Sequence, residues 1–140
     1  MTRRIEVAFP VPCEAAFDFL VDPHNRTRWQ SSLRAVGDAR PMPPQAGTRW
    51  RERATGGVVS EMRLTVVDRP TTWAETGTSH GISMDLSLSF AVAPTGCLVT
   101  AQVDFAGRGL WRALVPIAAR LFPHAIRHDL IRAARLLGDD

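Results

Sequence analysis

Among the acidic and histidine side chains of this sequence, the candidates for moving protons at a site are Glu52, Glu75 and His80. Glu52 follows Trp50 by two positions in TRWRE, and Glu75 follows Trp73 by two in TTWAE. Residues two apart in a strand share a face, so each carboxyl faces an apolar interior if its tryptophan does. A desolvated carboxyl has a raised pKa and can act as a general acid or base. These residues are the weak catalytic candidates.

The opposite interpretation of the two carboxyls stays open. A register slip of one residue would turn either of them toward water, and apolar cores rarely hold two unpaired acids. Several mechanisms are excluded, because the chain has no lysine for a Schiff base and no tyrosine for a phenolic acid. It also lacks a nucleophile elbow, a phosphate loop and a dinucleotide fingerprint. We therefore expect no cofactor.

Two histidines, His124 and His128, have the i,i+4 spacing of helical metal ligands. Arg120 and Arg127 lie beside them, and the glutamate of a metalloprotease motif does not follow His124. The favoured interpretation is a solvated histidine pair, and no metal is expected.

Strands dominate the first three quarters of the chain. Apolar residues recur at every second position, which indicates one buried and one wet face and hence an antiparallel sheet. The expected strands cover 5–9, 33–38, 48–53, 61–66, 71–76, 82–92 and 97–105. Met62, Leu64 and Val66 form one expected inner face, and the even positions from Ile82 to Val92 form another. The expected connections are 39–47, Gly56-Gly57, 77–81 and 94–96.

Helical spacing appears in three places: 12–20, 22–29 and 109–138. The last segment carries two apolar stripes that do not share a face. Leu114, Ile117, Ala118 and Leu121 form one stripe, and Ile126, Leu130, Ala133 and Leu137 form the other. Pro116 fits the first turn, and Pro123 predicts a bend. A helix this long needs a large apolar surface, which the strands would provide.

Composition indicates one globular domain over residues 1–140. The chain is 45% hydrophobic and 22% charged, which is neither disordered nor membrane-like. No apolar run is long enough to cross a membrane, and the N-terminus has no signal-peptide core, so we expect a cytoplasmic protein without integral membrane association. Cys13 and Cys97 suit a reducing compartment.

The excess of basic over acidic residues does not predict a nucleic-acid partner. The net charge is only +3, and the pI reaches about 10.0 because every strong base is an arginine and the chain has neither lysine nor tyrosine. The arginines are dispersed, whereas nucleic-acid footprints are contiguous patches with interleaved stacking aromatics.

Taken together, the sequence resembles the START-like or SRPBCC superfamily, which includes polyketide cyclase/dehydrase-like and birch-pollen-allergen-like proteins. The resemblance rests on VPCEAAFDFL, DPHNRTRW ending in Trp29, GTRWRE, PTTWAE, PTGCLVTAQVDF and the terminal helix. It covers nearly the whole chain and is specific for fold rather than activity. It implies an α+β helix-grip fold, a curved seven-stranded antiparallel sheet around a long C-terminal helix, with two short helices between strands 1 and 2.

The resemblance also implies a cavity between sheet and helix, with His80 at its mouth. The residues expected to line it are Trp50, Met62, Leu64, Trp73, Met84, Leu86, Val103, Phe105, Leu114 and Leu121. Three functions follow as alternatives: binding of a hydrophobic small molecule, which we favour; a polyketide cyclase/dehydrase-type enzyme; and a protein-interaction or toxin-like role. The chain is expected to be a monomer or a homodimer.

Overall fold

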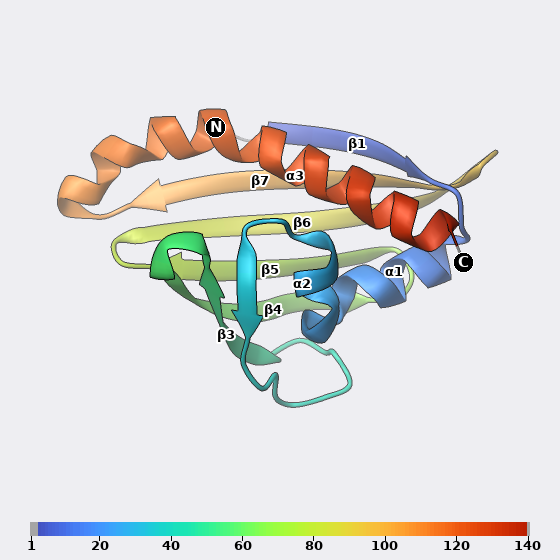
Figure 1. Cartoon of the computed structure of the whole chain (residues 1–140), viewed down its shortest axis with the longest axis horizontal. Coiled ribbons are helices and arrows are strands. Elements are labelled where there is room, and N and C mark those ends of the chain that lie inside the picture. The colour runs from blue at the N-terminus through green and yellow to red at the C-terminus, as the bar shows by residue number, and fades with distance from the viewer. Residues whose placement is uncertain (1–2, 140) are drawn as a thin grey trace.

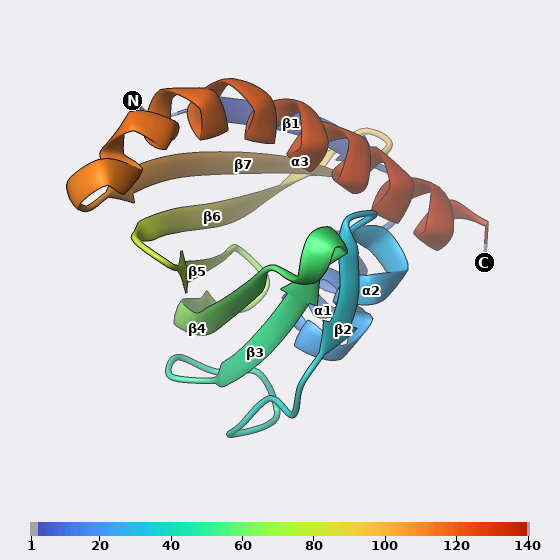
Figure 2. The same ribbon diagram turned by 60° about the vertical axis from the view of Figure 1, so that its left-hand side comes forward.

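The computed structural model describes residues 3–139, and within them seven strands form one antiparallel sheet. Its strand order is β1-β7-β6-β5-β4-β3-β2. The strands are β1 (Arg3–Phe9), β2 (Leu33–Val36), β3 (Arg49–Ala54), β4 (Val59–Asp68), β5 (Thr72–Ser79), β6 (Ile82–Ala93) and β7 (Gly96–Gly107). Figures 1 and 2 show the sheet curling, so that β2 and β3 come forward while β1 lies beneath the terminal helix. The predicted α+β helix-grip fold is confirmed.

Two short helical segments separate β1 from β2, as predicted. The first is α1 (Cys13–Val21), and the second combines the 3-10 turn η1 (Pro23–Asn25) with α2 (Arg26–Trp29). The Asp22 side chain accepts a hydrogen bond from the His24 backbone N–H at 2.9 Å, which caps η1. The remaining elements are the 3-10 turns η2 (Thr55–Gly57) and η3 (Gly109–Leu114) and the long helix α3 (Val115–Gly138).

The glycine pair predicted to make a tight turn does so in η2. Gly56 and Gly57 have φ of 85° and 80°, a region that residues with a Cβ avoid. The connection predicted over 77–81 is shorter than expected, because β5 continues through Ser79 and leaves only His80 and Gly81 in the turn to β6. The last strand, β7, expected to end at residue 105, continues to Gly107.

Two residues expected on the inner face lie outside the core. Val66 is 44% exposed, because the register of β4 against β5 shifts between Leu64 and Val66. This bulge directs Val67 toward the core in its place, opposite the buried Trp73. Val92, near the end of β6, is 90% exposed. Its predicted burial is therefore also wrong.

The two cysteines were expected to stay reduced, and the structure instead joins them. A disulfide connects Cys13 at the start of α1 to Cys97 on β7, across 84 residues of sequence. Both residues are buried beside Phe9 in the main core. The bond ties the first helix to the last strand.

The long helix has two halves with different surroundings. Ile126, Leu130 and Ala133 are buried, whereas Ile117 and Leu121 are 55% and 62% exposed. Ile117 and Ile126 are nine residues apart, as are Leu121 and Leu130, and nine residues make about two and a half helical turns. The two stripes therefore point in opposite directions, and the structure buries only the second.

Polar contacts also hold the C-terminal half of α3. The buried carboxyl of Asp129 accepts hydrogen bonds from the backbone N–H and hydroxyl of Ser31, at 3.2 and 3.0 Å. Arg132 donates to the Arg28 carbonyl at 3.1 Å. The helix is thus fixed to the segment around α2, and it runs unbroken through Pro123. The predicted bend at that residue stays a prediction.

We expect the two halves of α3 to respond very differently to the same truncation. Leu130→Ala should lower the free energy of unfolding by about 2–5 kcal/mol, because it leaves a cavity in a packed core. Leu121→Ala should change it by only about 0.5 kcal/mol, since that side chain is mainly exposed. Urea unfolding of both variants measures the difference, and equal losses would place Leu121 in a packed interface.

Candidate functional site

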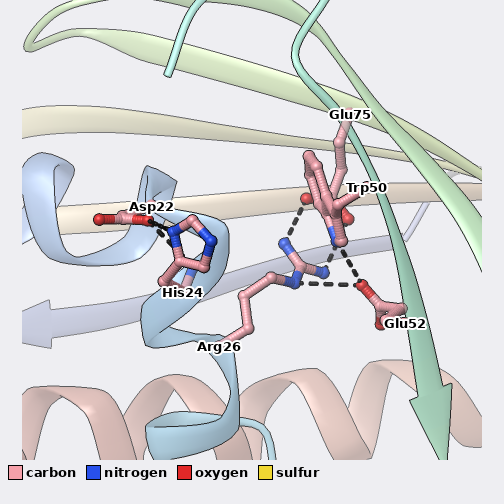
Figure 3. A network of polar contacts seen from close by, with 6 residues as sticks. All are labelled: Asp22, His24, Arg26, Trp50, Glu52 and Glu75. Atoms are coloured by element: carbon pink, nitrogen blue, oxygen red, sulfur yellow. Dashed lines mark hydrogen bonds and ion pairs between the residues drawn. The ribbon is translucent and has the colours of Figure 1, made fainter. Parts of the chain in front are cut away.

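The centre of the molecule holds a charged cluster that sequence reasoning did not find. Arg26, the first residue of α2, is 3% exposed. Its guanidinium donates two hydrogen bonds to Glu75, at 2.6 Å to Oε1 and 3.0 Å to Oε2, and its Nε lies 3.3 Å from Oε1 of Glu52. Figure 3 shows the guanidinium between the two carboxylates. We call these three residues the buried ion cluster.

Three separate elements position the cluster. Asp22 and Pro23 begin the helical turn that carries Arg26, Glu52 lies on β3, and Glu75 lies on β5. The guanidinium carbon also lies 5.3 Å from the ring centroid of Trp50 and 6.0 Å from that of Trp29. A cation at that distance is attracted to the aromatic ring. The two carboxylates and the two indole rings together offset the cost of burying the positive charge of Arg26.

Glu52 and Glu75 both face inward, which decides between the two interpretations that the sequence left open. The Glu75 side chain is fully buried and that of Glu52 is 12% exposed. Trp50, at the predicted same-face position, donates to Glu52 Oε1 at 3.0 Å. The sequence argument counted two unpaired acids against burial, because it lacked their partner. The available signal was the DPHNRTRW motif, which places Arg26 three residues before Trp29.

Burial and ion pairing act in opposite directions on Glu75. Desolvation raises the pKa of its carboxyl above the ordinary value of 4.5, and attraction to Arg26 reduces that rise without cancelling it. For Arg26, burial opposes the charged form, but Glu75 and Glu52 together raise its pKa. Arg26 is therefore held as a cation, whereas burial shifts the pKa of Glu75 upward, toward the protonated acid.

The pH dependence of stability tests this assignment. Because the folded protein holds the Glu75 proton to higher pH than the unfolded chain does, the stability supplied by that proton is complete below about pH 4.5. It is lost as pH rises through the raised pKa. We expect the difference in free energy of unfolding, wild type minus Glu75→Gln, to fall as pH increases from about 4.5.

Denaturant unfolding of the wild type and of Glu75→Gln, repeated at several pH values above about 4.5, measures the difference in free energy of unfolding. The charge control is Glu14→Gln, which removes an exposed acid on α1. A difference that grows with pH would mean that Arg26 lowers the pKa of Glu75 instead.

His80, the third catalytic candidate, lies away from the ion cluster. It is an exposed residue in the β5–β6 turn with φ of 57°. Its imidazole stacks on Trp111 of η3, with centroids 5.2 Å apart and planes at 16°. Gly81 lies under the same indole, where a Cβ would collide with the ring. The turn and η3 therefore touch, and His80 has a structural contact there.

Of the ten expected lining residues, six are buried in the core: Trp50, Met62, Leu64, Trp73, Leu86 and Val103. Met84 and Phe105, which face each other across β6 and β7, are half-buried. Leu114 and Leu121 are exposed, and Leu121 lies on the side of α3 opposite to Leu130. These two do not join the others.

Two hollows are bordered mainly by residues outside this predicted set, although Leu86 borders the first of them. One, of about 200 Å³, lies over β4 to β7 and includes Thr65, Asp85 and Gln102. The other, of about 400 Å³, lies between β1 and α3 and is lined by Arg3, Arg4, Ile5, Arg120, Pro123, His124 and Arg127. The predicted wet side of α3, which carries Arg120, His124, Arg127 and His128, is exposed as expected.

Solved structures with the same fold span nearly the whole chain. MLL2253 from Mesorhizobium loti is 17% identical, with a TM-score of 0.75, over 99% of this chain and 98% of that one. Ara h 8.0201 is 15% identical, with a TM-score of 0.76, over 100% and 99%. DynU16, from the dynemicin biosynthetic locus, is 15% identical, with a TM-score of 0.68, over 98% of this chain and 47% of that one. At these identities the likeness concerns the fold.

No curated protein matches the sequence. Residues 1–138 match the family model described as "Polyketide cyclase / dehydrase and lipid transport". The match covers the ion cluster, the curved sheet and α3 together, which confirms the START-like resemblance. The chain therefore belongs to the polyketide cyclase/dehydrase and lipid-transport family of START-like proteins.

Proposed function

We propose that this protein binds a hydrophobic small molecule, of lipid, aromatic or polyketide character, against the inner face of its sheet. The observation that carries the proposal is a gradient of burial along the β6–β7 pair. Leu88 and Ala101 are fully buried, and so are Leu86 and Val103 one step along the ladder. The next inner pair, Met84 and Phe105, is only half-buried.

The cover over this end of the sheet is loose. Phe122 of α3 packs edge-on against Phe105, with centroids 5.2 Å apart, yet Phe122 remains 44% exposed. Apolar side chains that stay accessible on a concave face are the usual lining of small-molecule sites. The family description, which includes lipid transport, supports the same class of ligand.

Within this proposal the buried core residues of the inner face form the floor of the site: Trp50, Met62, Leu64, Trp73, Leu86 and Val103. The ion cluster holds α2 against β3 and β5 beneath them. The indole N–H groups of Trp29 and Trp73 are buried and have no hydrogen-bond partner within residues 3–139. Each is a donor available to an acceptor on a ligand or to water.

The acid–base enzyme remains the second alternative, with less support. Both oxygens of Glu75 accept hydrogen bonds from Arg26, and His80 is stacked on Trp111. A group committed to such contacts has to release them before it can take a substrate proton. The toxin-like interaction role, the cytoplasmic location and the monomeric or homodimeric state stay predictions. Within residues 3–139, no helix is long and apolar enough to cross a membrane.

A paired substitution on β6 tests the binding proposal. Met84→Arg places a charge on the inner face, and Asp85→Arg places the same charge next to it on the outer face. We expect Met84→Arg to weaken binding of a hydrophobic fluorescent probe at least about tenfold, because a buried cation must be desolvated. Asp85→Arg should leave the affinity within about twofold.

Native mass spectrometry of freshly purified protein accompanies the titration and identifies any molecule that remains bound. Equal affinities in the two variants, or no probe binding by the wild type, would refute an inner-face site.

A further inference from the structure

The 3-10 turn η3 and the first half of α3 combine exposed apolar and basic side chains. Leu110, Leu114, Ile117 and Leu121 are 94%, 42%, 55% and 62% exposed, and we call these four residues the outer stripe. Ile117 and Leu121 point away from the buried side of α3, as the nine-residue spacing to Ile126 and Leu130 requires. These two residues of the stripe therefore lie outside the proposed ligand site.

The charge around the outer stripe has one sign. Between Phe105 and His128 the sequence contains four arginines and two histidines and no aspartate or glutamate. Arg108, Arg112, Arg120 and Arg127 are all exposed. Arg3 and Arg4 on β1 extend this charge across the hollow that Arg120, His124 and Arg127 line. Glu6, which pairs with Arg4 at 3.6 Å, is the acid facing this region from β1.

We propose that the outer stripe and its arginines dock this protein on an anionic membrane surface. An interfacial helix presents leucine and aromatic side chains to the acyl boundary and arginines to the phosphate headgroups. Arginine can reach those headgroups while its stem covers apolar surface. Trp111, 41% exposed beside the stripe, has an amphipathic ring suited to the headgroup level.

The same charges disfavour a second copy of this chain as the occupant. A symmetric dimer through the stripe would bring the same surface of both copies together. Arg112 and Arg120 would then face arginines and histidines, with no acid between residues 105 and 128 to pair with them. A membrane rich in anionic lipid supplies the opposite charge and an apolar layer at the same time.

Vesicle flotation tests the proposal with the full chain. We expect binding to vesicles of equal parts phosphatidylcholine and phosphatidylglycerol, and much weaker binding to phosphatidylcholine alone. Ile117→Ser with Leu121→Ser should lower the partition coefficient at least about tenfold, because two apolar side chains no longer enter the acyl boundary. The matched control is Val66→Ser with Val92→Ser, two exposed valines on the sheet, which should bind as the wild type does.

Charge is tested separately. Arg112→Gln and Arg120→Gln should each weaken binding to the anionic vesicles about fivefold, whereas Arg51→Gln on β3 should not. Raising the salt from about 0.1 M to 1 M shortens the screening length from about 10 Å to 3 Å and should release the wild type.

Three outcomes would overturn the proposal. The first is no binding to either vesicle, and the second is binding that the stripe substitutions leave unchanged. The third is a concentration-dependent dimer, seen by sedimentation velocity, that the stripe substitutions abolish, since a second copy would then cover this surface. Inner-face variants such as Met84→Arg should still float with the vesicles, so the docking and ligand proposals fail independently.

Discussion

Replacing Arg26 with methionine should lower the free energy of unfolding by about 3–5 kcal/mol, the usual cost of removing one partner from a buried ion pair. Methionine fills a similar volume, so the loss reflects charge rather than a cavity. Glu75, whose side chain is fully buried, would lose both of its Arg26 hydrogen bonds. Glu52 would keep its hydrogen bond from Trp50 and has some access to water. Urea unfolding measures the loss.

A matched double variant separates pairing from packing. Arg26→Met together with Glu75→Leu removes both charges, and hydrophobic replacement of a whole buried pair is often neutral or stabilising. We expect the double variant to recover most of the stability that Arg26→Met loses. The stability of Arg26→Lys should lie between that of the wild type and that of Arg26→Met, because an ammonium keeps the charge but does not reproduce the two parallel hydrogen bonds to Glu75. A double variant as unstable as the single one would show that Arg26 acts mainly through its ring contacts with Trp29 and Trp50.

Removing the disulfide should produce the second large effect. Cys13→Ala with Cys97→Ala opens a covalent loop that spans 84 residues of sequence, and the unfolded chain then gains conformational freedom. Loss of a native disulfide typically costs about 2–5 kcal/mol. Because the sulfurs are buried in the core, part of the loss also comes from packing. Denaturant unfolding of the double variant measures the sum.

Reductant provides the matched control for this prediction. It should lower the stability of the wild type toward that of the double alanine variant and leave the variant itself unchanged. Wild-type protein whose cysteines react with an alkylating agent as soon as it unfolds, without prior reduction, would contradict the bond. The same labelling in intact cells bears on the expected cytoplasmic location, because disulfides persist mainly in oxidising compartments.

Local pattern was sufficient to predict the strands and the long helix. The alternation from Ile82 to Phe90 has one register that buries its apolar side chains, and the helical spacing of Ile126, Leu130 and Ala133 has one buried side. Such periodicities depend on neighbours within a few residues, so they can be recognised without the fold. The same argument placed Glu52 and Glu75 on the face of their tryptophans.

The partner of those carboxylates could not be predicted in this way. Arg26 belongs to a four-residue helix next to Arg28, and an arginine there ordinarily indicates a wet surface. Its burial depends on the curl of the sheet, which brings β3 and β5 around α2. Arg26 and Glu75 are 49 residues apart in the sequence, so a pattern of neighbouring residues cannot indicate that they are in contact.

Strands and helices could be placed from the amino-acid sequence, because short-range spacing specifies them. Which of their faces are covered depends on how the elements pack together. The bulge after Leu64 exposes Val66, the disulfide joins α1 to β7 across 84 residues of sequence, and only the C-terminal half of α3 buries its apolar stripe. An apolar stripe indicates that a face would be more stable away from water. Whether that face is buried depends on the elements that pack against it.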